Sequence, residues 1–289
     1  MFFMVAFMAT LVTLLLYTQV GREETLIISA IVGFNAALVE MISHSGNDNL
    51  LIPLTTFAFI SIHIGHDLQM LRMHLMIFGV IFILVTIANR VKILSKIAIV
   101  EAIVVGYLTA ILYGGYALIP PLFTIMTVMR FPKRRKNEKS NLYDARIIET
   151  NVIIPIAICG IAAITGWRKE LFMIYASSYA MHLIINTFVR FKYYLNFSEI
   201  DSILFAICKG IGFVFIPSLI VYNITFGEMI NIYMLMTMII AMILSSIMIY
   251  TKKKNVIKEE ILMSNAYMHM KIVLILTILI GGVQILQII

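Results

Sequence analysis

Residues 1–20, MFFMVAFMATLVTLLLYTQV, contain no charged side chain and are apolar almost throughout. A helix of about 20 such residues is long enough to cross the roughly 30 Å hydrocarbon core of a bilayer. A secretory signal would need a basic first segment and a cleavage site between small residues, and this stretch has neither. We therefore expect these residues to form a retained transmembrane helix.

The rest of the chain repeats this apolar pattern. Its composition is 61% hydrophobic and 13% charged, whereas soluble domains are about 45–50% apolar and about 25% charged. Apolar windows predict about eleven membrane-spanning helices. The predicted spans are 1–20, 25–43, 50–66, 72–89, 96–114, 117–131, 147–166, 170–188, 201–224, 230–250 and 268–288. We expect an all-α, polytopic integral membrane protein. The segment 117–131 is short and contains Pro120 and Pro121, so a re-entrant or half helix is the alternative there.

Basic residues are distributed unevenly between alternate loops. Most follow even-numbered spans, as in the run KRRKNEK at 133–139, and few follow odd-numbered spans. Because cytoplasmic loops collect Lys and Arg, this asymmetry predicts a cytoplasmic N-terminus and an external C-terminus. The formal charge of +7 then lies mainly on one membrane face, where it attracts anionic lipid headgroups. We do not expect nucleic acid binding, because no soluble module with interleaved aromatic residues accompanies this charge.

Acidic and amide residues gather in GFNAALVEMISHSGNDNLLIPL, residues 33–54. Glu40 lies near the end of the second predicted span, where a carboxylate needs water, a cation or a partner, and His44 falls on the same helix face. After a short turn, Asp48 and Asn49 are good N-cap residues for the third span. Two carboxylates beside a helix N-terminus can hold Mg²⁺ against a triphosphate. The alternative is a capped helical hairpin with one interfacial glutamate.

This stretch resembles the C-terminal signature of the CTP-dependent lipid-alcohol kinases, namely phytol kinase and dolichol kinase, and of the related cytidylyltransferases. The signature reads A-A-x-V-E, then D-N-L and a proline after a short turn. The matching residues are Ala36, Ala37, Val39, Glu40, Asp48, Asn49, Leu50 and Pro53. The resemblance implies a catalytic site at Glu40, Asp48 and Asn49, with Mg²⁺ held by Glu40 and Asp48 and CTP as donor. It implies a kinase-like membrane domain at 1–89. The family's earlier helices have no counterpart before residue 25, so we expect only the C-terminal part of that site.

Residues 90–289 resemble a second membrane family, whose best-known member is phytyl-phosphate kinase. The segment from Arg90 to Pro121 is similar to its opening helix pair, with the Gly-Gly turn at Gly114 and Gly115, and YDARIIETNVIIP resembles its Arg–Asn helix start, at Arg146 and Asn151. The spacing from Arg146 to Asn151 is one residue short of the pattern. The family's acidic Ala-Asp-Thr-x-x-Ser-Glu motif is replaced by YAMHLIINTFVR at 179–190, which has no carboxylate.

Further polar residues leave alternatives open. Lys209, inside the predicted span 201–224, either extends its ammonium to the membrane interface or, with Arg146 and His44, binds phosphate. His182 lies in an apolar stretch, where a hydrogen-bonded packing role is the alternative to a functional one. His63 and His66 share a helix face, and zinc binding would require another ligand such as His74. These histidines can equally mark a solvated helix end.

Together these patterns predict a protein of isoprenoid-lipid metabolism. Its expected partners are membrane lipids, a long-chain isoprenoid alcohol or its phosphate, and a second membrane subunit. The first hypothesis is a kinase that phosphorylates lipid alcohols or lipid monophosphates at the cytoplasmic face. The alternatives are a non-catalytic lipid-binding subunit that completes a partner's site and, third, a small transporter lined by Glu40, His182 and Lys209.

Overall fold

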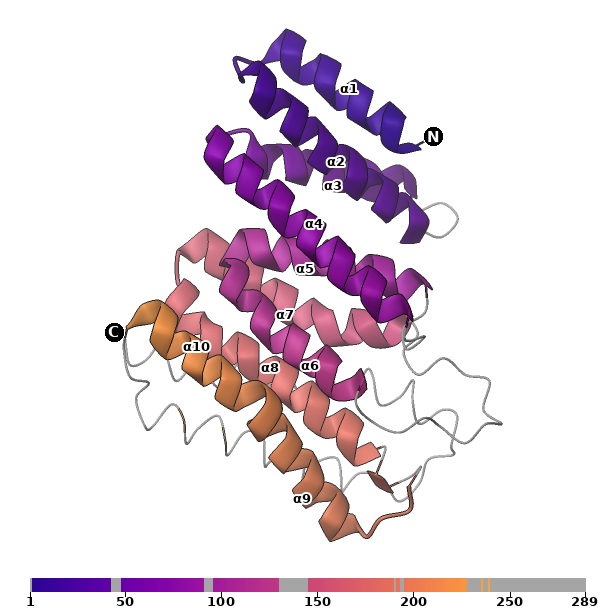
Figure 1. The fold of residues 1–289 in the computed structure, drawn as a ribbon, viewed down its shortest axis with the longest axis vertical. Helices are drawn as coiled ribbons and strands as arrows, with labels where there is room; N and C mark the ends of the chain where they lie inside the picture. The colour runs from indigo at the N-terminus through magenta and orange to yellow at the C-terminus, as the bar shows by residue number, and fades with distance from the viewer. Residues whose placement is uncertain are drawn as a thin grey trace. The chain divides into compact units, whose positions relative to one another are not determined.

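The computed structural model describes residues 2–42, 48–90, 96–129, 145–189, 191–192, 195–227, 235 and 239. Within these residues every regular element is a helix and no strand occurs, which confirms the predicted fold class at the level of an all-helical chain. In chain order the elements are α1 (Phe2–Tyr17), α2 (Arg22–Ile42), α3 (Asp48–His63), α4 (Leu68–Arg90), α5 (Lys96–Tyr113), η1 (Gly115–Leu118), α6 (Ile119–Met129), α7 (Ala145–Thr165), α8 (Arg168–Val189), α9 (Glu199–Gly210), η3 (Ile211–Phe215) and α10 (Ile216–Phe226) (Figure 1).

The predicted spans from 1–20 to 201–224 each coincide with a helix or a continuous helical run. The last two predicted spans, 230–250 and 268–288, lie outside the described residues. By length and composition, three described helices are long and apolar enough to cross a membrane: Arg22–Met41, Arg168–Phe188 and Glu199–Phe226. Shorter apolar helices make up most of the remaining described chain. These findings indicate a membrane protein.

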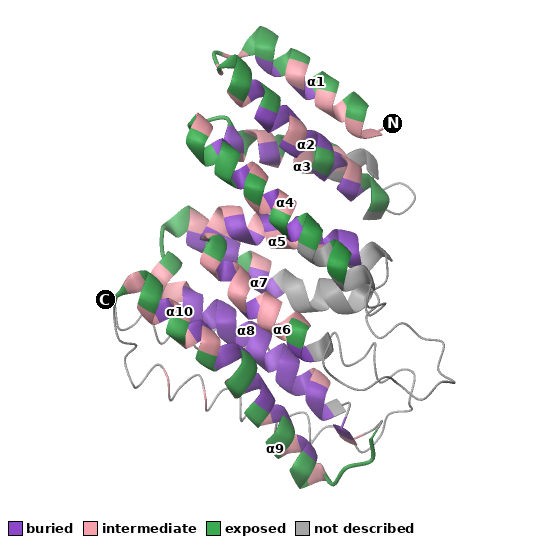
Figure 2. Ribbon diagram, in the orientation of Figure 1, coloured by how far each residue is buried: buried purple, intermediate pink, exposed green. Residues whose placement is uncertain are grey.

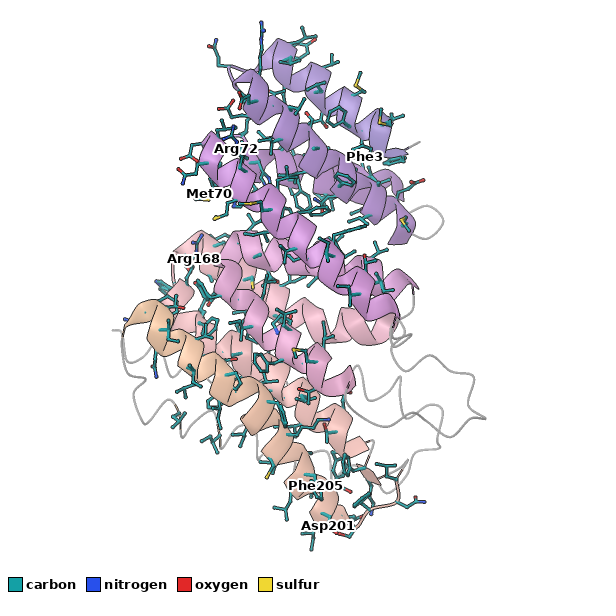
Figure 3. All side chains as sticks on the ribbon, in the orientation of Figure 1. Phe3, Met70, Arg72, Arg168, Asp201 and Phe205 are labelled. Carbon is teal, nitrogen blue, oxygen red and sulfur yellow. The ribbon has the colours of Figure 1, made fainter. Side chains whose placement is uncertain are left out.

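The chain packs as two units, one formed by residues 1–111 and 139–148 and the other by residues 112–138 and 149–289. In the first unit, α2 packs against α1, α3 and α4. Gly33 allows α1 to approach α2 closely, because a Cβ at this position would lie 3.1 Å from Cβ of Phe7. Beside it, Phe3, labelled in Figure 3, packs its ring 4.4 Å from that of Phe34, centroid to centroid.

The beginnings of α2 and α4 meet at one end of the first unit. Arg72, near the start of α4, donates to Oε2 of Glu23 in the first turn of α2 at 2.9 Å (Figure 3). The start of α4 is capped by Asp67, whose Oδ1 accepts a hydrogen bond from the backbone N–H of Met70 at 2.7 Å. The side chains of Arg72 and Glu23 are both largely exposed, so their ion pair contributes little to stability. It marks the polar end of the unit.

The second unit is built around α8, which Figure 2 shows buried along its length. Helices α6, α9 and α10 and the short π-helix η3 pack against it. Two tyrosine hydroxyls cross-link the surrounding backbone: Tyr175 donates to the carbonyl oxygen of Ala117 at 2.8 Å, and Tyr113 donates to that of Arg168 at 2.6 Å. The predicted turn at Gly114 is present, with φ of 115°, a conformation that favours glycine.

Helices α9 and α10 form one continuous helical run interrupted by a π-helical turn. Ser198 caps the start of α9, because its Oγ accepts from the N–H of Asp201 at 3.1 Å. The π-helical residues Ile211–Phe215 immediately precede Pro217. A proline lacks an N–H and its ring crowds the carbonyl four residues earlier, so the widened turn accommodates Pro217 without ending the helix. Gly227 ends the run with φ of 67°.

The close crossing of α8 and α9 depends on Gly210. A Cβ at Gly210 would lie 2.9 Å from the carbonyl oxygen of Ala180 and would collide with the side chain of Ile184. Gly212, two residues later, has open space around its Cβ position.

We predict that Gly210→Ala lowers the stability of the protein by about 1–3 kcal/mol, the usual cost of overpacking. Gly212→Ala is the matched control, because it brings the same gain in helix propensity without the collision. Thermal or SDS-induced unfolding of both variants in micelles measures the difference. Equal stabilities would contradict the assigned crossing.

Candidate functional site

The predicted catalytic residues lie at the connection between α2 and α3. Glu40 is exposed two residues before α2 ends at Ile42, whereas Leu38 and Val39 beside it are buried. Asp48 and Asn49 are the first two residues of α3, and the structure describes their helical backbone but not their side chains. His44 lies in the connection 43–47, outside the described residues. Because α2 and α3 pack together, their joined ends bring Glu40 and the start of α3 to one end of the first unit.

The predicted phosphate-binding cations belong to different units. Arg146 is the second residue of α7, in the first unit, and its side chain is not described. Lys209 lies in the second unit, where its side chain is buried with 8% exposed. It shares a face of α9 with Ser202 and Ala206, which are also buried, and this spacing of three and four residues marks one side of a helix.

A second polar group of the first unit is a cluster of His63, His66, His74 and Tyr107, which we call the histidine cluster. The ring centroids of His63 and His74, and those of His66 and His74, are 5.2 Å apart. His63 and Tyr107 stack at 6.2 Å with nearly parallel rings. The cluster therefore joins the end of α3, the α3–α4 turn, α4 and α5, and it lies at the end of α3 opposite to Asp48.

The hydrogen bonds of His63 determine its tautomer. Its Nδ1 lies 2.6 Å from the carbonyl oxygen of Phe59, and its Nε2 lies 3.0 Å from the hydroxyl oxygen of Tyr107. A carbonyl only accepts, so Nδ1 carries a hydrogen and donates it. In a neutral imidazole Nε2 must then accept, and the Tyr107 hydroxyl donates to it.

Aromatic rings enclose this hydrogen bond. The ring of Phe59 stacks on Tyr107 at 5.8 Å, and the ring of Phe78 meets Tyr107 edge-on at 5.1 Å. His63 and Tyr107 are both fully buried. A hydrogen bond in such an apolar environment is costly to break, since neither group can turn to water instead.

The histidines lie as close together as the zinc hypothesis predicts, but the described residues do not form such a metal site. His74 does lie beside His63 and His66, yet both ring nitrogens of His63 are already hydrogen-bonded. Among the described residues, no group of three or more His, Cys, Asp or Glu side chains is arranged to hold a metal ion. The geometry favours a hydrogen-bonded cluster over a coordination centre.

Comparison with known proteins adds no family assignment. No protein-family model matches the chain, and no curated protein or solved structure matches it significantly. The resemblances drawn from the motifs around Glu40 and Arg146 therefore stay predictions.

Tyr107 is a member of the histidine cluster that the sequence did not predict. The only signal was a tyrosine in the middle of an apolar run, IVVGYLTAIL, where its hydroxyl needs a partner. The partner is 44 positions away in the sequence, so only the packing of α3 against α5 identifies it.

We predict that Tyr107→Phe lowers the unfolding free energy at pH 8 by about 1–2 kcal/mol, because Nε2 of His63 loses its donor while remaining buried. Tyr17→Phe is the control, since the Tyr17 side chain is 82% exposed. Unfolding of both variants in lipid nanodiscs checks this. A Tyr107→Phe variant as stable as the wild type would contradict the hydrogen bond.

Proposed function

We propose that this protein is a membrane-embedded phosphotransferase of isoprenoid-lipid metabolism, which phosphorylates a long-chain lipid alcohol or lipid monophosphate with CTP. In this proposal Glu40, Asp48 and Asn49 form the catalytic site, and His44 and Arg146 bind the nucleotide phosphates. The observation that carries the proposal is the exposed Glu40 at the end of a candidate membrane span, directly before a helix that begins with Asp48 and Asn49.

Glu40, Asp48 and Asn49 carry oxygen ligands of the kind that the proposed Mg²⁺ requires. Carboxylate and amide oxygens are the ligands that Mg²⁺ prefers, and Glu40, Asp48 and Asn49 supply them. Glu40 and Asp48 would hold Mg²⁺, which would supply charge neutralisation for the polyphosphate. The N-terminus of α3 presents backbone N–H groups that favour an anion at the same place.

The protein's residues position the donor and balance the charge of the phosphates. Glu40 and Asp48 fix the position of the donor, and basic side chains balance the negative charge of the phosphates, since phosphoryl transfer depends mainly on positioning and electrostatics. The lipid tail lies among apolar helix faces, which keeps its hydroxyl near the membrane surface where the nucleotide binds.

The membrane topology belongs to the same proposal. We propose about eleven spans, with a cytoplasmic N-terminus and an external C-terminus, because basic residues follow the even-numbered spans. The three described helices that are long and apolar enough to span support a membrane location. This arrangement places Glu40, Asp48 and the KRRKNEK run on the cytoplasmic side, where CTP is available.

A second candidate function is a non-catalytic lipid-binding subunit that completes a partner's site. It is favoured by α8, whose residues 179–189 contain no carboxylate where the second family carries its acidic motif. In this helix His182 is fully buried. A protein of this kind would bind lipid without transferring phosphate and would co-purify with a second membrane protein.

We predict that purified protein in nanodiscs transfers phosphate from CTP to phytol, farnesol or a polyprenol in the presence of Mg²⁺. Glu40→Gln and Asp48→Asn should each lower kcat about 100-fold or more, because several kcal/mol of charge stabilisation depend on the metal. Glu24→Gln, at the opposite end of α2, is the control and should leave kcat unchanged. Wild-type protein that phosphorylates none of these alcohols from CTP or ATP would refute catalysis by this chain alone.

We further predict opposite membrane sidedness for the loops before α7 and before α8. In a variant with Cys159 and Cys208 replaced by alanine, a single cysteine at Lys136 should react with an impermeant maleimide only from the cytoplasmic side. A cysteine at Trp167, which is exposed, should react only from the outside. Labelling of both positions from the same side would exclude the proposed topology.

A further inference from the structure

Two members of the histidine cluster have ring nitrogens available for a ligand. His63 uses both of its ring nitrogens in hydrogen bonds within the protein. Nδ1 of His74 is buried and makes no hydrogen bond within the described part of the chain, although only 5% of the residue is exposed. The ring of His66 is partly exposed and has no hydrogen-bond partner among the described residues. Because a buried nitrogen without a partner is costly, His74 marks a place where a bound ligand would be stabilised.

The rings of His66 and His74 lie close enough together to share one metal ion. Their centroids are 5.2 Å apart, and the rings meet edge-on. An imidazole nitrogen binds a metal ion at about 2 Å, which places the centroids of two imidazoles on one ion about 5–6 Å apart when the angle at the ion is bent. His63 lies at the same centroid distance from His74, but it has no ring nitrogen left to offer.

Met70 is placed to add a thioether to this pair of imidazoles. A side chain in a helix points back toward the N-terminus of that helix, so the His74 ring extends over the first turn of α4. Met70 lies in that turn, four residues before His74 and on the same helix face, and is labelled in Figure 3 at the start of α4. His66 directly precedes the turn, and its ring meets that of His74 there. Two imidazoles and one thioether therefore converge on the first turn of α4.

Packing does not explain a methionine at this position. Met70 is exposed, and its neighbours Asp67, Gln69 and Arg72 are also exposed, at the polar end of the first unit. A thioether contributes little to packing where it is not buried. At this end of the helix it is accessible to an ion that arrives from solvent.

The types of donor select a soft cation of low charge. Thioether and imidazole ligands together suit Cu⁺, whereas Zn²⁺ takes a tetrahedral set of thiolate, imidazole or carboxylate ligands. Asp67, the carboxylate beside His66, is already used to cap α4, because its Oδ1 accepts from the N–H of Met70 at 2.7 Å. Cu⁺ is stable with a smaller set of ligands, and a single charge loses less hydration energy than a double charge on leaving water.

We propose that His66, Met70 and His74 form a binding site for Cu⁺ at the turn between α3 and α4. The ion is held by one ring nitrogen of each histidine and by Sδ of Met70, and it ties the turn to the first two turns of α4. The site stands apart from phosphoryl transfer, because it lies at the end of α3 opposite to Asp48. In the proposed topology this end faces the outside, so the ion binds from the external side.

Titration of the full chain in nanodiscs with Ag⁺ tests the site, because Ag⁺ shares the ligand preference of Cu⁺ and keeps its oxidation state. A parent protein with Cys159 and Cys208 replaced by alanine removes competing thiols, and a chloride-free buffer keeps Ag⁺ dissolved. We expect the parent to bind Ag⁺, and Met70→Leu and His74→Leu each to bind it about 10-fold or more weakly, since each removes a ligand. Met8→Leu, which changes an exposed methionine of α1, is the control and should bind as the parent does. Equal affinities in all four proteins would overturn the proposal.

A residue-specific measurement identifies the thioether among the 20 methionines of the chain. In the parent labelled with ¹³C at its methionine methyl groups, Ag⁺ should shift the resonance that is missing from the spectrum of Met70→Leu. The resonance that is missing from Met8→Leu should stay in place. A Met70 resonance that Ag⁺ does not shift would overturn the proposal. So would binding of Zn²⁺ that is tighter than that of Ag⁺ and insensitive to Met70→Leu, because the histidines would then hold a different ion without the thioether.

The folding of the variants is checked in the same samples. Leucine has nearly the volume of methionine, and Met70 is exposed, so Met70→Leu should unfold at the temperature of the parent when no Ag⁺ is present. Neither CTP nor a lipid alcohol enters these measurements. Their result is therefore independent of whether the chain transfers phosphate.

Discussion

In hydrocarbon no water is present to hydrogen-bond polar groups, so each polar group of a membrane protein must find its partner within the protein. The described chain meets this constraint at two levels. All its regular backbone is helical, and several of its small polar side chains bond back to the carbonyl oxygen four residues earlier. Ser29 donates to Thr25, Asn35 to Ile31 and Ser218 to Val214 in this way, at 2.6–2.9 Å. Such bonds make serine, threonine and asparagine compatible with apolar helices.

The same constraint decides where longer polar side chains lie. A tyrosine hydroxyl lies too far from its own helix backbone to bond there, so it bonds to a neighbouring helix and fixes the packing. Tyr107 does this with His63, and Tyr175 does it with the carbonyl of Ala117. Helices in lipid gain little from the hydrophobic effect, and association therefore depends on these bonds and on close contacts at small residues such as Gly33 and Gly210.

Much of the fold follows from the sequence because the length and hydropathy of an apolar run directly determine a membrane helix. The prediction placed a span in every helix or helical run of the described residues, including α6, which carries both prolines in its first turn, although several spans were predicted to start up to four residues late. Contacts between helices were harder to predict, since they depend on which face of each helix meets its neighbour. The proximity of His63, His66 and His74 follows partly from helical spacing, but the partnership with Tyr107 does not. Nor could hydropathy predict the π-helical turn before Pro217 or the burial of Lys209.

The continuous helical run from Glu199 to Phe226 has a consequence for the surrounding lipid. Its 28 residues rise about 42 Å at 1.5 Å each, whereas a bilayer core is about 30 Å thick. A run of this length placed across a bilayer would tilt, curve or locally thicken the bilayer. The π-helical turn at Ile211–Phe215 lies near its middle, where a weakened hydrogen-bond ladder makes bending easiest. In a bilayer, a mismatch in thickness would therefore act on this helix at the turn beside Gly210, where it crosses α8.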